Sequence, residues 1–299
     1  MKLSIIGSGI VGQATGKYLL ELGHQVVFMD VLPATIEKLK KENLSATTSI
    51  YDAVKNSDAA FVCVPTPNNT NGEQDISIIQ KVSADIGKAL ADKKEYFTVV
   101  IKSTVLPGTT KNIVLPELEK HSGKIAGGDF GLCMNPEFLT FVQTTWTNDK
   151  AMDKKPSNEV RIVIGEFNEE SGKVLEEVYK NSSSPKFHTS LEEAEFAKYA
   201  NNFLLPAKIS AWNELFLLAE GLREKKIMDL NTEKIAKILS LDNRIGLYGS
   251  VHGKAYGGLC FSKDPQAFAN WASRFIDSKM IKGTVETNKN MAEKYGIRQ

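Results

Sequence analysis

The stretch Lys2-Leu3-Ser4-Ile5-Ile6-Gly7-Ser8-Gly9-Ile10-Val11-Gly12 decides the fold of this chain. An apolar strand runs directly into the glycine pattern G-x-G-x-x-G, and a helical pattern follows it as far as Gly23. A second apolar strand, His24–Met29, then ends at Asp30. The glycine pattern alone would be weak evidence, but strand, glycine turn, helix, strand and terminal acid in this order are typical of a dinucleotide-binding unit.

The glycines and the acid of this unit can each be assigned a role in binding a dinucleotide. Gly7 permits the tight turn, Gly9 admits the pyrophosphate, and Gly12 lets the helix pack closely on the strand. The phosphates are expected at the helix N-terminus, where free N–H groups and the helix dipole favour an anion. Asp30 would bind a ribose diol and repel a 2′-phosphate, which favours NAD over NADP. The cofactor-binding residues expected from this unit are Gly7, Gly9, Ile10, Val11, Gly12 and Asp30.

Composition and charge narrow the class of protein. At 299 residues and 42% hydrophobic, the chain can bury a large core and is expected to form two domains. A net charge of +1 with interspersed lysines and acids argues against nucleic acid or an anionic membrane as a partner. Three cysteines without a CxxC motif, no membrane-length apolar run and no signal peptide indicate a cytoplasmic protein. The four histidines are scattered and lack the spacing of metal ligands, so we expect no metal site.

Alternating strand and helix patterns fill the first part of the chain, and the strand patterns stop from about Leu191. Repeated βα units predict a doubly wound parallel Rossmann-type sheet, an α/β fold, over residues 1–190. The remainder, 191–299, is expected to be an all-α domain with a long central helix over Glu192–Lys225, kinked at Pro206. Two more helices are expected over Pro265–Lys279 and Gly283–Lys294. The apolar residues of the long helix predict a homodimer that forms through it.

Polar residues stand where three predicted strands end, which is the edge at which parallel sheets bind ligands. They are Thr66 after the strand Ala59–Val64, Ser103 and Thr104 after Thr98–Ile101, and Glu137 after Gly131–Met134. A single polar strand end means little. Three that face the same crevice as the glycine turn suggest a site.

Two further patterns lie in the second half. Lys198 and Asn202 are four residues apart and therefore share one face of a helix. The simplest alternative to a functional role is that this face is exposed to solvent. The stretch Tyr256–Asp264 places the thiol of Cys260 after two glycines, with Lys263 and Asp264 one turn downstream. A nearby cation favours the nucleophilic thiolate, although a buried structural cysteine is the alternative. Cys63, within a predicted strand, is expected to be a core residue.

Together these motifs resemble the UDP-glucose/GDP-mannose 6-dehydrogenase family. They follow the family's order along nearly the whole chain, and the cysteine motif is specific. The motifs are Gly7–Gly12, Val64-Pro65-Thr66-Pro67, Lys102-Ser103-Thr104, Asn135-Pro136-Glu137-Phe138-Leu139, Lys198-Tyr199-Ala200-Asn201-Asn202, Asn213-Glu214 and Gly257-Gly258-Leu259-Cys260-Phe261-Ser262-Lys263-Asp264.

The resemblance implies a four-electron oxidation of a sugar C6 alcohol to a carboxylate, with two NAD reduced in turn and UDP-glucose as the foremost substrate. It implies that Cys260 captures the aldehyde, that Lys198 and Asn202 stabilise oxyanions, and that Glu137 acts as a base. Asp264 with Thr104 would activate water. Further residues implied toward NAD are Thr66, Ser103, Thr104, Glu137 and Lys263. Those implied toward the sugar nucleotide are Phe138, Leu139, Lys198, Asn202, Arg244, Tyr248, Tyr256 and Gly257.

The chain departs from the family pattern in two places. Phe141 stands where the family has a further acid, and the chain ends at Gln299, where a second Rossmann-like domain would begin. We therefore expect a truncated or naturally minimal form, in which a partner chain could supply the missing grip on the substrate. Two other functions stay open: a two-electron β-hydroxyacid dehydrogenase, which needs no thiol, and an inactive dimeric NAD-binding protein.

Overall fold

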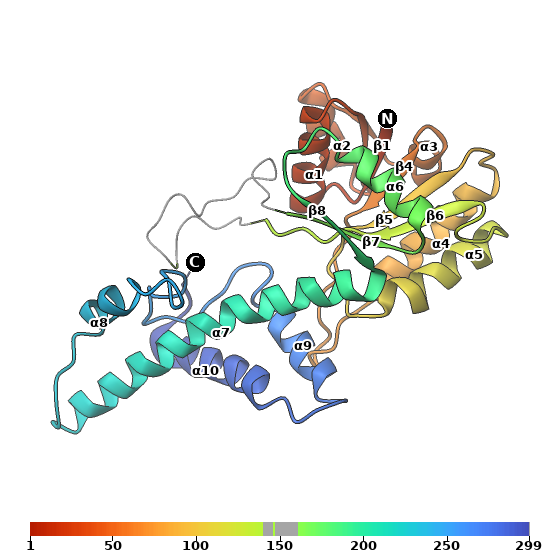
Figure 1. Ribbon diagram of the computed structural model, residues 1–299. Helices are drawn as coiled ribbons and strands as arrows, with labels where there is room; N and C mark the ends of the chain where they lie inside the picture. Colours follow the sequence, from red (N-terminus) through yellow and green to blue (C-terminus); the bar gives the residue numbers. More distant parts are fainter. Residues whose placement is uncertain (140–145, 147–160, 299) are drawn as a thin grey trace. The chain divides into compact units, whose positions relative to one another are not determined.

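A computed structural model describes residues 1–139, 146 and 161–298 of the chain (Figure 1). Two compact units can be distinguished, and each is described by itself. The first unit consists of Met1–Pro67, Gln74–Leu139 and Pro156–Lys198, and the second of Asn68–Glu73, Thr140–Lys155 and Tyr199–Gln299. The segment Asn68–Glu73 thus belongs to the second unit although both its flanks belong to the first. Phe141, where the sequence departs from the family pattern, lies outside the described residues.

The first unit contains an eight-stranded sheet in the order β3-β2-β1-β4-β5-β6-β7-β8. Every neighbouring pair is parallel except β6 and β7, which pair antiparallel at Cys133↔Glu166 and Met134↔Gly165. The doubly wound Rossmann-type fold is confirmed. The strands are β1 Lys2–Ile6, β2 Gln25–Met29, β3 Ser45–Thr47, β4 Ala59–Val62, β5 Phe97–Ile101, β6 Phe130–Met134, β7 Ile162–Glu166 and β8 Lys186–Ser190.

Three features of the sheet differ from the sequence prediction. β7 was expected to run parallel to its neighbours, but an apolar strand has the same pattern in either direction, so the pattern could not reveal its sense. The strands β3 and β8 were not expected at all. Both lie at the edges of the sheet and carry half-buried or exposed, largely polar residues, so neither presents the apolar run that marks a buried strand.

Two apolar layers sandwich this sheet, because successive strand residues point to opposite faces. Ile5 and Phe61 pack in the layer formed with α1, α2 and α6, whereas their neighbours Ile6 and Val62 pack in the layer with α3, α4 and α5. Each face of the sheet is thus covered by helices. The helices are α1 Ile10–Glu21, α2 Pro33–Lys41, α3 Ile50–Lys55, α4 Ser77–Ala91, α5 Leu115–Ser122, which continues the π-helical turn η1 Thr110–Val114, and α6 Glu169–Val178.

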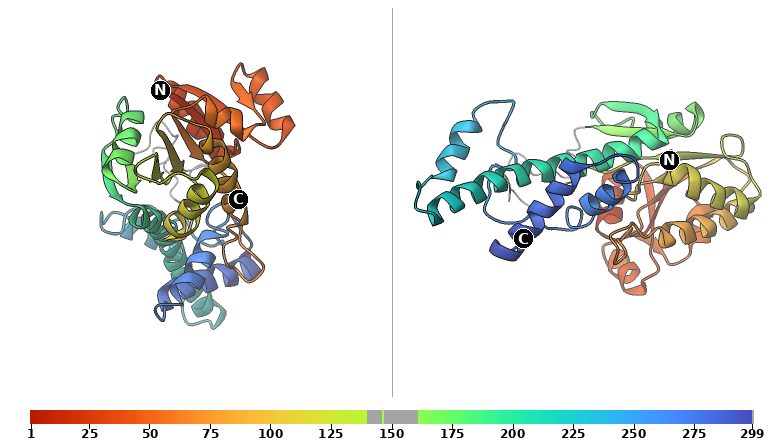
Figure 2. Two further views of the ribbon diagram at one scale, coloured as in Figure 1. Left: turned by 90° about the vertical axis from the view of Figure 1, so that its right-hand side faces the viewer. Right: turned by 90° about the horizontal axis from the view of Figure 1, so that it is seen from below.

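The second unit is helical in the part that the structure describes. The long helix α7, Leu191–Glu224, begins in the first unit (Figure 2). From Tyr199 onward it belongs to the second unit, and other helices of that unit pack against it. α9, Asp264–Ala272, packs on it through Tyr199 stacked on Phe268, and α10, Lys279–Tyr295, through Ser210 donating to the carbonyl of Thr284. α8 spans Thr232–Leu239. No helix among the described residues is long and apolar enough to cross a membrane.

The long central helix was predicted almost to the residue, but the helix expected over Pro265–Lys279 was wrong in its extent. α9 ends at Ala272, and the chain starts a new helix at Lys279. The apolar side chains of Phe275 and Ile276 lie exposed in the connection between the two helices. Pro206 lies inside α7, which continues through it.

Two helical glycines should respond to alanine with opposite sign. A Cβ on Gly16 in α1 would lie 2.2 Å from the ring of buried Phe28, so Gly16→Ala should destabilise the fold by about 1–3 kcal/mol. A Cβ on Gly221 in α7 would meet no atom within 4 Å, so Gly221→Ala should stabilise it by about 0.5–1 kcal/mol. Urea unfolding of both variants checks this, and a Gly16→Ala variant no less stable than the wild type would contradict the packing of α1 on β2.

Candidate functional site

The turn between β1 and α1 can be built only from glycines at two positions. Gly7 has φ +92°, and a Cβ there would lie 2.8 Å from the carbonyl oxygen of Cys63. A Cβ on Gly12 would lie 2.0 Å from the carbonyl oxygen of Gly7. Gly9 is different, because the position of its absent Cβ has no atom within 4 Å. Two glycines therefore close the turn, and the third leaves open space beside the start of α1.

That open space suits a phosphate group. Gly9 is the N-cap of α1 and has no side chain with which to satisfy the first N–H groups of the helix. Ile10, the first residue of α1, is exposed, and Val11 is half-buried. Unsatisfied N–H groups at a helix N-terminus, approached over a glycine, are the usual cradle for a pyrophosphate.

The carboxylate of Asp30 lies beside this turn, at the end of β2. One oxygen accepts a hydrogen bond from Ser8 N at 2.8 Å, and the other accepts from Leu32 N at 3.0 Å. These two bonds fix the orientation of the carboxylate, and each oxygen retains lone pairs that can accept from a hydroxyl. A ribose diol would satisfy them. The turn and its acid thus fit an adenine dinucleotide.

The loops that follow β4 and β5 are tied together by side-chain hydroxyls. Thr66 donates to the carbonyl of Thr104 at 2.8 Å, and Ser103 donates to the carbonyl of Val64 at 2.7 Å. Gln74 adds a third hydrogen bond between these loops, since its amide nitrogen donates to the same Thr104 carbonyl at 2.8 Å. Thr66, Ser103 and Thr104, each predicted from a strand end, are therefore brought together.

A buried ion pair stands behind the loop that follows β6. Lys198 Nζ donates to Glu137 Oε1 at 2.9 Å and to the Glu137 carbonyl at 2.5 Å, and each side chain is only 4% exposed. Burial alone raises the pKa of Glu137, but the Lys198 ammonium, the N–H of Leu139 at 2.6 Å and the charge of Lys102 outweigh it, so this pKa lies below its ordinary value. The carboxylate is therefore ionised near neutral pH.

The ring of Phe138, the next residue, lies near two cations. The guanidinium of Arg161 is 3.9 Å from the centre of its ring, and Lys198 Nζ is 5.4 Å from it. Cations attract the negative face of an aromatic ring, and the attraction strengthens where water is excluded. The turn Glu137-Phe138-Leu139 is thus held through its carboxylate, its ring and its backbone N–H. All three residues were predicted from the sequence to lie at the site.

A second buried network supports this turn and was missed in the sequence. Lys102, at the end of β5, donates to Asn135 Oδ1 at 2.8 Å, and Tyr179 donates to the same oxygen at 2.7 Å. The Asn135 amide in turn donates to the carbonyl of Val163 in β7 at 2.8 Å. Lys102 and Asn135 both belong to the quoted motifs, and each directly follows a predicted strand. That placement at neighbouring strand ends was the signal from which their pairing could have been predicted.

In the second unit, Asn202 and Asp264 form a buried hydrogen-bonded pair. Asn202 Nδ2 donates to Asp264 Oδ2 at 2.7 Å, and Lys263 Nζ lies 2.5 Å from the other carboxylate oxygen. Lys263 is partly exposed, whereas Asp264 is buried. The carboxylate of Asp264 therefore has one oxygen oriented by an amide and the other by a cation. Asn202 stands one turn after Lys198 on α7.

Cys260 lies in the turn that leads into α9, four residues before Asp264. Its carbonyl accepts from the backbone N–H groups of Asp264 at 2.9 Å and Lys263 at 3.2 Å, and its side chain is half-buried. The other two cysteines differ in chemistry. Burial raises the pKa of Cys63 to about 12 and raises that of Cys133 even further above its usual range, so both remain thiols near neutral pH. Cys63 packs against the apolar layer as expected.

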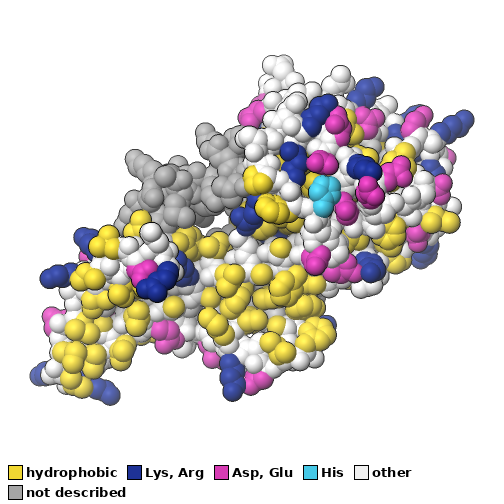
Figure 3. Space-filling model, viewed as in Figure 1, with side chains coloured by type: hydrophobic (Ala, Val, Ile, Leu, Met, Phe, Trp, Pro, Cys, Tyr) yellow, Lys and Arg dark blue, Asp and Glu magenta, His cyan; other side chains and the backbone are white. Residues whose placement is uncertain are grey.

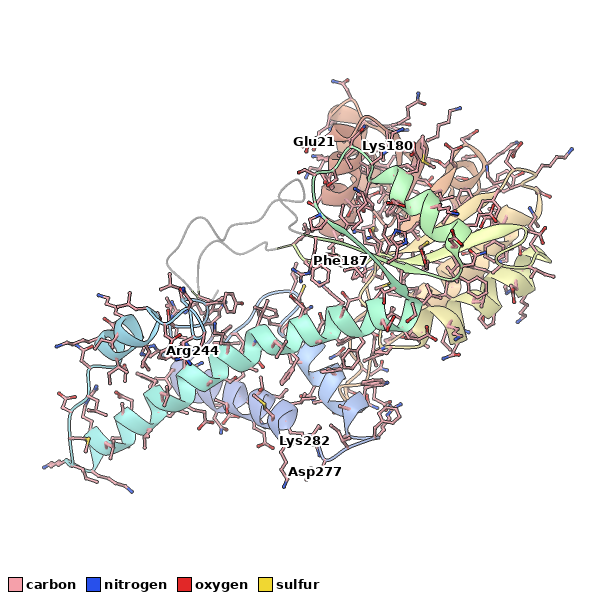
Figure 4. All side chains as sticks on the ribbon, in the orientation of Figure 1. Glu21, Lys180, Phe187, Arg244, Asp277 and Lys282 are labelled. Carbon is pink, nitrogen blue, oxygen red and sulfur yellow. The ribbon has the colours of Figure 1, made fainter. Side chains whose placement is uncertain are left out.

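The remaining predicted residues do not all converge. Tyr256 packs with Tyr248, Ile209 and Trp146 in a small apolar cluster, and a Cβ on Gly257 would lie 2.5 Å from Ile297. Arg244 instead points outward in the loop after α8 and pairs with Asp242 at 2.6 Å (Figure 4). Among residues 1–139, 146 and 161–298, no cluster of three or more His, Cys, Asp or Glu side chains is suited to a metal ion.

Comparisons with known proteins cover both units. A family model described as the NAD binding domain of the UDP-glucose/GDP-mannose dehydrogenase family matches residues 39–183, and the model of that family's central domain matches residues 192–290. The GDP-mannose 6-dehydrogenase of Pseudomonas aeruginosa is 34% identical over 98% of this chain and 70% of its own length. A UDP-glucose 6-dehydrogenase of Haloferax volcanii is 31% identical over 98% of this chain and 71% of its own.

Solved structures agree with these matches. A UDP-glucose dehydrogenase from Pyrobaculum islandicum superposes with a TM-score of 0.84 at 31% identity, covering 98% of this chain and 68% of that one. A ternary complex of GDP-mannose dehydrogenase from Pseudomonas aeruginosa gives 0.74 at 32% identity, covering 98% of this chain and 69% of that one. Sugar-nucleotide dehydrogenase structures near 22% identity share the fold.

The buried ion pair should show strong coupling in a double-mutant cycle. Lys198→Met strands an ionised carboxylate in the interior and should cost about 3–5 kcal/mol, whereas adding Glu137→Gln should recover a large part of that loss. Because the folded-state pKa of Glu137 is lowered, its contribution is present above its ordinary value and fades as pH falls through the lowered one. Urea unfolding at pH 7 and at acid pH measures both effects.

A matched exposed pair serves as the control. Lys111 and Glu192 lie 2.9 Å apart with side chains 55% and 39% exposed, and they should couple by about 0–1 kcal/mol. Additive losses at Lys198 and Glu137 would mean that the pair is solvated.

Proposed function

Because the chain belongs to the UDP-glucose/GDP-mannose dehydrogenase family, we propose that it oxidises the C6 alcohol of a nucleotide sugar to the carboxylate. The relatives' names point to UDP-glucose and GDP-mannose as the substrates to be tried. The observation that carries the proposal is the turn before α9, where a half-buried cysteine precedes a carboxylate bound by both Lys263 and Asn202. A thiol can hold the aldehyde of a four-electron oxidation as a covalent intermediate, and a two-electron oxidation has no use for one.

NAD is the cofactor of this family's NAD-binding domain, and when bound it accepts hydride. The open space over Gly9, the uncapped start of α1 and the oriented carboxylate of Asp30 would hold its pyrophosphate and ribose. Thr66, Ser103, Thr104, Glu137 and Lys263 are proposed as further contacts to the cofactor. Asp30 would select NAD over NADP, because a 2′-phosphate beside its carboxylate is repelled.

In the first oxidation, the C6 carbon would lose its hydride, and the C6 hydroxyl would give its proton to a water held by Asp264 and Thr104. Negative charge develops on the C6 oxygen as that proton leaves. We assign its stabilisation to the ammonium of Lys198 and the amide of Asn202, which are a cation and a neutral donor on successive turns of α7. Both side chains are already oriented by buried carboxylates, so little reorganisation is needed.

The second oxidation passes through Cys260. Its sulfur would form a bond to the aldehyde carbon while the thiol proton passes to the carbonyl oxygen, which gives a thiohemiacetal. Loss of a second hydride from that carbon, together with the proton of the new hydroxyl, would leave a thioester. Water then displaces the sulfur, with Glu137 accepting the proton of the attacking water, and the acid is released. Lys198 keeps Glu137 in the ionised form that can accept a proton, and by lowering its pKa it also makes Glu137 a weaker base. Two hydrides leave the same carbon, so two NADH form for each acid.

Contacts to the nucleotide sugar are proposed on both units. Phe138 and Leu139 lie next to the Lys198–Glu137 pair, and Tyr256 and Gly257 precede Cys260 by a few residues. Tyr248 contributes to the same apolar cluster as Tyr256. Arg244 is bound to Asp242 at the surface, so its proposed contact with the substrate requires it to leave that pair.

The thiol chemistry also bears on where the protein works. Cys63, Cys133 and Cys260 form no disulfide with one another. Cys260 must remain reduced to act as a nucleophile, and a reducing compartment maintains thiols. We therefore place the protein in the cytoplasm.

Counting NADH per acid tests the proposed reaction. With UDP-glucose or GDP-mannose, the wild type should form two NADH for each carboxylate, because one carbon loses two hydrides. Cys260→Ser should form no acid, since a hydroxyl does not give the thioester. Absorbance of NADH together with chromatography of the sugar nucleotides gives both numbers. Cys63→Ala, which removes a thiol whose pKa is about 12, is the control and should keep the ratio of two.

Different failures of this test have different meanings. One NADH per product would leave a two-electron alcohol dehydrogenase. Acid formed normally by Cys260→Ser would remove the thioester from the mechanism. No turnover with any sugar nucleotide, despite measurable NAD binding, would leave a cofactor-binding protein.

We further propose that two copies of the chain associate through α7. Three leucines on its second-unit part, Leu204, Leu215 and Leu218, are 50–61% exposed, and with Ala211 they recur every three, four or seven residues. Such spacing forms one stripe along a helix and is typical of helix–helix seams. Apolar side chains are gathered over this part of the surface (Figure 3).

Sedimentation velocity tests the association. The wild type should sediment as a dimer at micromolar concentration, and Leu215→Glu with Leu218→Glu should shift it to monomer, because two charges would be buried in the seam. Leu241→Glu is the matched control, since Leu241 is 84% exposed in another part of the second unit. A dimer that survives the paired substitution would place the interface elsewhere.

A further inference from the structure

The carboxylate of Glu195 is buried on α7 and holds a loop of the first unit. The residue is 0% exposed. One oxygen accepts from the backbone N–H of Gly108 at 2.6 Å, and the other accepts from the N–H of Thr110 at 2.7 Å. The reaction scheme above does not use this group. A fully buried acid with two short hydrogen bonds to a loop calls for an explanation.

Burying this acid is costly. Burial raises the pKa of Glu195 to about 7, against the opposing effect of the hydrogen bonds from Thr110 and Gly108. An apolar residue would avoid the desolvation, but Thr110 begins η1 and a buried N–H needs an acceptor. A carboxylate is the side chain that accepts two N–H groups at once. The unfavourable burial of this carboxylate is therefore coupled to hydrogen bonds that hold the loop in one conformation.

The loop held by Glu195 is the one that carries Thr104. At its other end, Gln74 donates to the carbonyl of Thr104 at 2.8 Å and accepts from Leu106 N at 3.1 Å. Within it, Thr109 donates to the carbonyl of Leu106 at 2.6 Å. Residues 104–110 are thus bonded near both ends, by Gln74 at the start and by Glu195 at the end.

On the helix side, Glu195 stands one turn before Lys198. Both side chains are buried, and residues three apart on a helix share a face. Glu195 bonds to the loop after β5, and Lys198 bonds to Glu137 in the loop after β6. This one turn of α7 therefore contacts two loops that follow neighbouring strands of the sheet. Gly165 lets the helix start close by, since a Cβ there would lie 2.5 Å from Ala194.

We propose that Glu195 is a positioning residue of the active site, which fixes the amine of Lys198 relative to Thr104 by tying their helix and loop together. This inference rests on the proposed oxidation of a nucleotide sugar, in which both residues act. A displacement of about 1 Å in a catalytic group can lower a rate by about a hundredfold. The anchor thus matters for turnover more than for binding of either substrate.

Glu195→Gln is the principal test. The glutamine oxygen can accept one of the two N–H groups, while its amide faces the other N–H as a second donor. In the full chain, kcat per folded molecule should fall about tenfold to a hundredfold, while KM for NAD and for the sugar nucleotide stays within about threefold. Glu195→Asp keeps the charge and both acceptor oxygens but is one methylene shorter. Its kcat should therefore lie between that of the wild type and that of Glu195→Gln.

Glu192→Gln is the matched control. Glu192 lies three residues earlier on α7 and pairs with Lys111 of η1, so it joins the same two elements at the surface. Its loss should change kcat by less than about twofold, because exposed pairs hold geometry weakly. A purely structural role of Glu195 would lower the midpoint of unfolding without lowering kcat per folded molecule.

Hydrogen exchange supplies a readout that does not depend on turnover. In the wild type the amides of Gly108 and Thr110 should exchange slowly, and in Glu195→Gln the protection of residues 104–110 should fall by about tenfold or more. Fast exchange of these amides in the wild type would overturn the anchor. A folded Glu195→Gln variant with wild-type kcat would overturn the positioning role. If the wild type forms no NADH with any sugar nucleotide, the proposed function fails, and the exchange experiment still decides whether the anchor exists.

Discussion

The burial of the Lys198–Glu137 pair is the constraint on which the described site depends. Two charges removed from water lose hydration that their mutual attraction repays only when geometry and additional hydrogen bonds are good. The structure supplies them: Leu139 N–H binds the carboxylate, and the Phe138 ring lies against the ammonium. The turn after β6 and the start of α7 are held in one arrangement by these contacts. An ionised carboxylate and a localised cation are the direct result.

The parallel sheet explains why residues distant in the chain belong to one constellation. Strand ends on the same edge bring together the turn after β1, the acid after β2 and the loops after β4, β5 and β6. Most of their polar side chains bond to backbone of a neighbouring loop, as Thr66 does to Thr104 and Ser103 to Val64. Lys102 and Asn135 add buried hydrogen bonds, because Lys102 donates to Asn135 and Asn135 donates to the carbonyl of Val163. The edge is therefore stiffened before any ligand binds.

The sequence predicted most of the fold and named the polar residues that the structure brings together at the strand ends, and its failures have physical causes. The glycine turn was predictable because only glycine fits the positive φ of Gly7 and the close approach at Gly12. Edge strands were not, because β3 and β8 bury too little to leave an apolar pattern. Glu195 and Gln74 escaped notice because their partners are backbone groups, which every residue possesses. The antiparallel sense of β7 likewise leaves no trace in residue types.

The hexapeptide Asn68–Glu73 has a consequence for how the chain can be divided. Asn68 donates to the carbonyl of Lys263 at 2.8 Å, Asn71 accepts from the Asn270 amide at 3.0 Å, and Glu73 pairs with Arg274 at 2.5 Å. An excised helical fragment beginning at residue 191 would lack all three contacts with α9 and the residues around it. The helical unit is thus completed by a segment from far upstream, so a single cut in the chain cannot yield that unit whole.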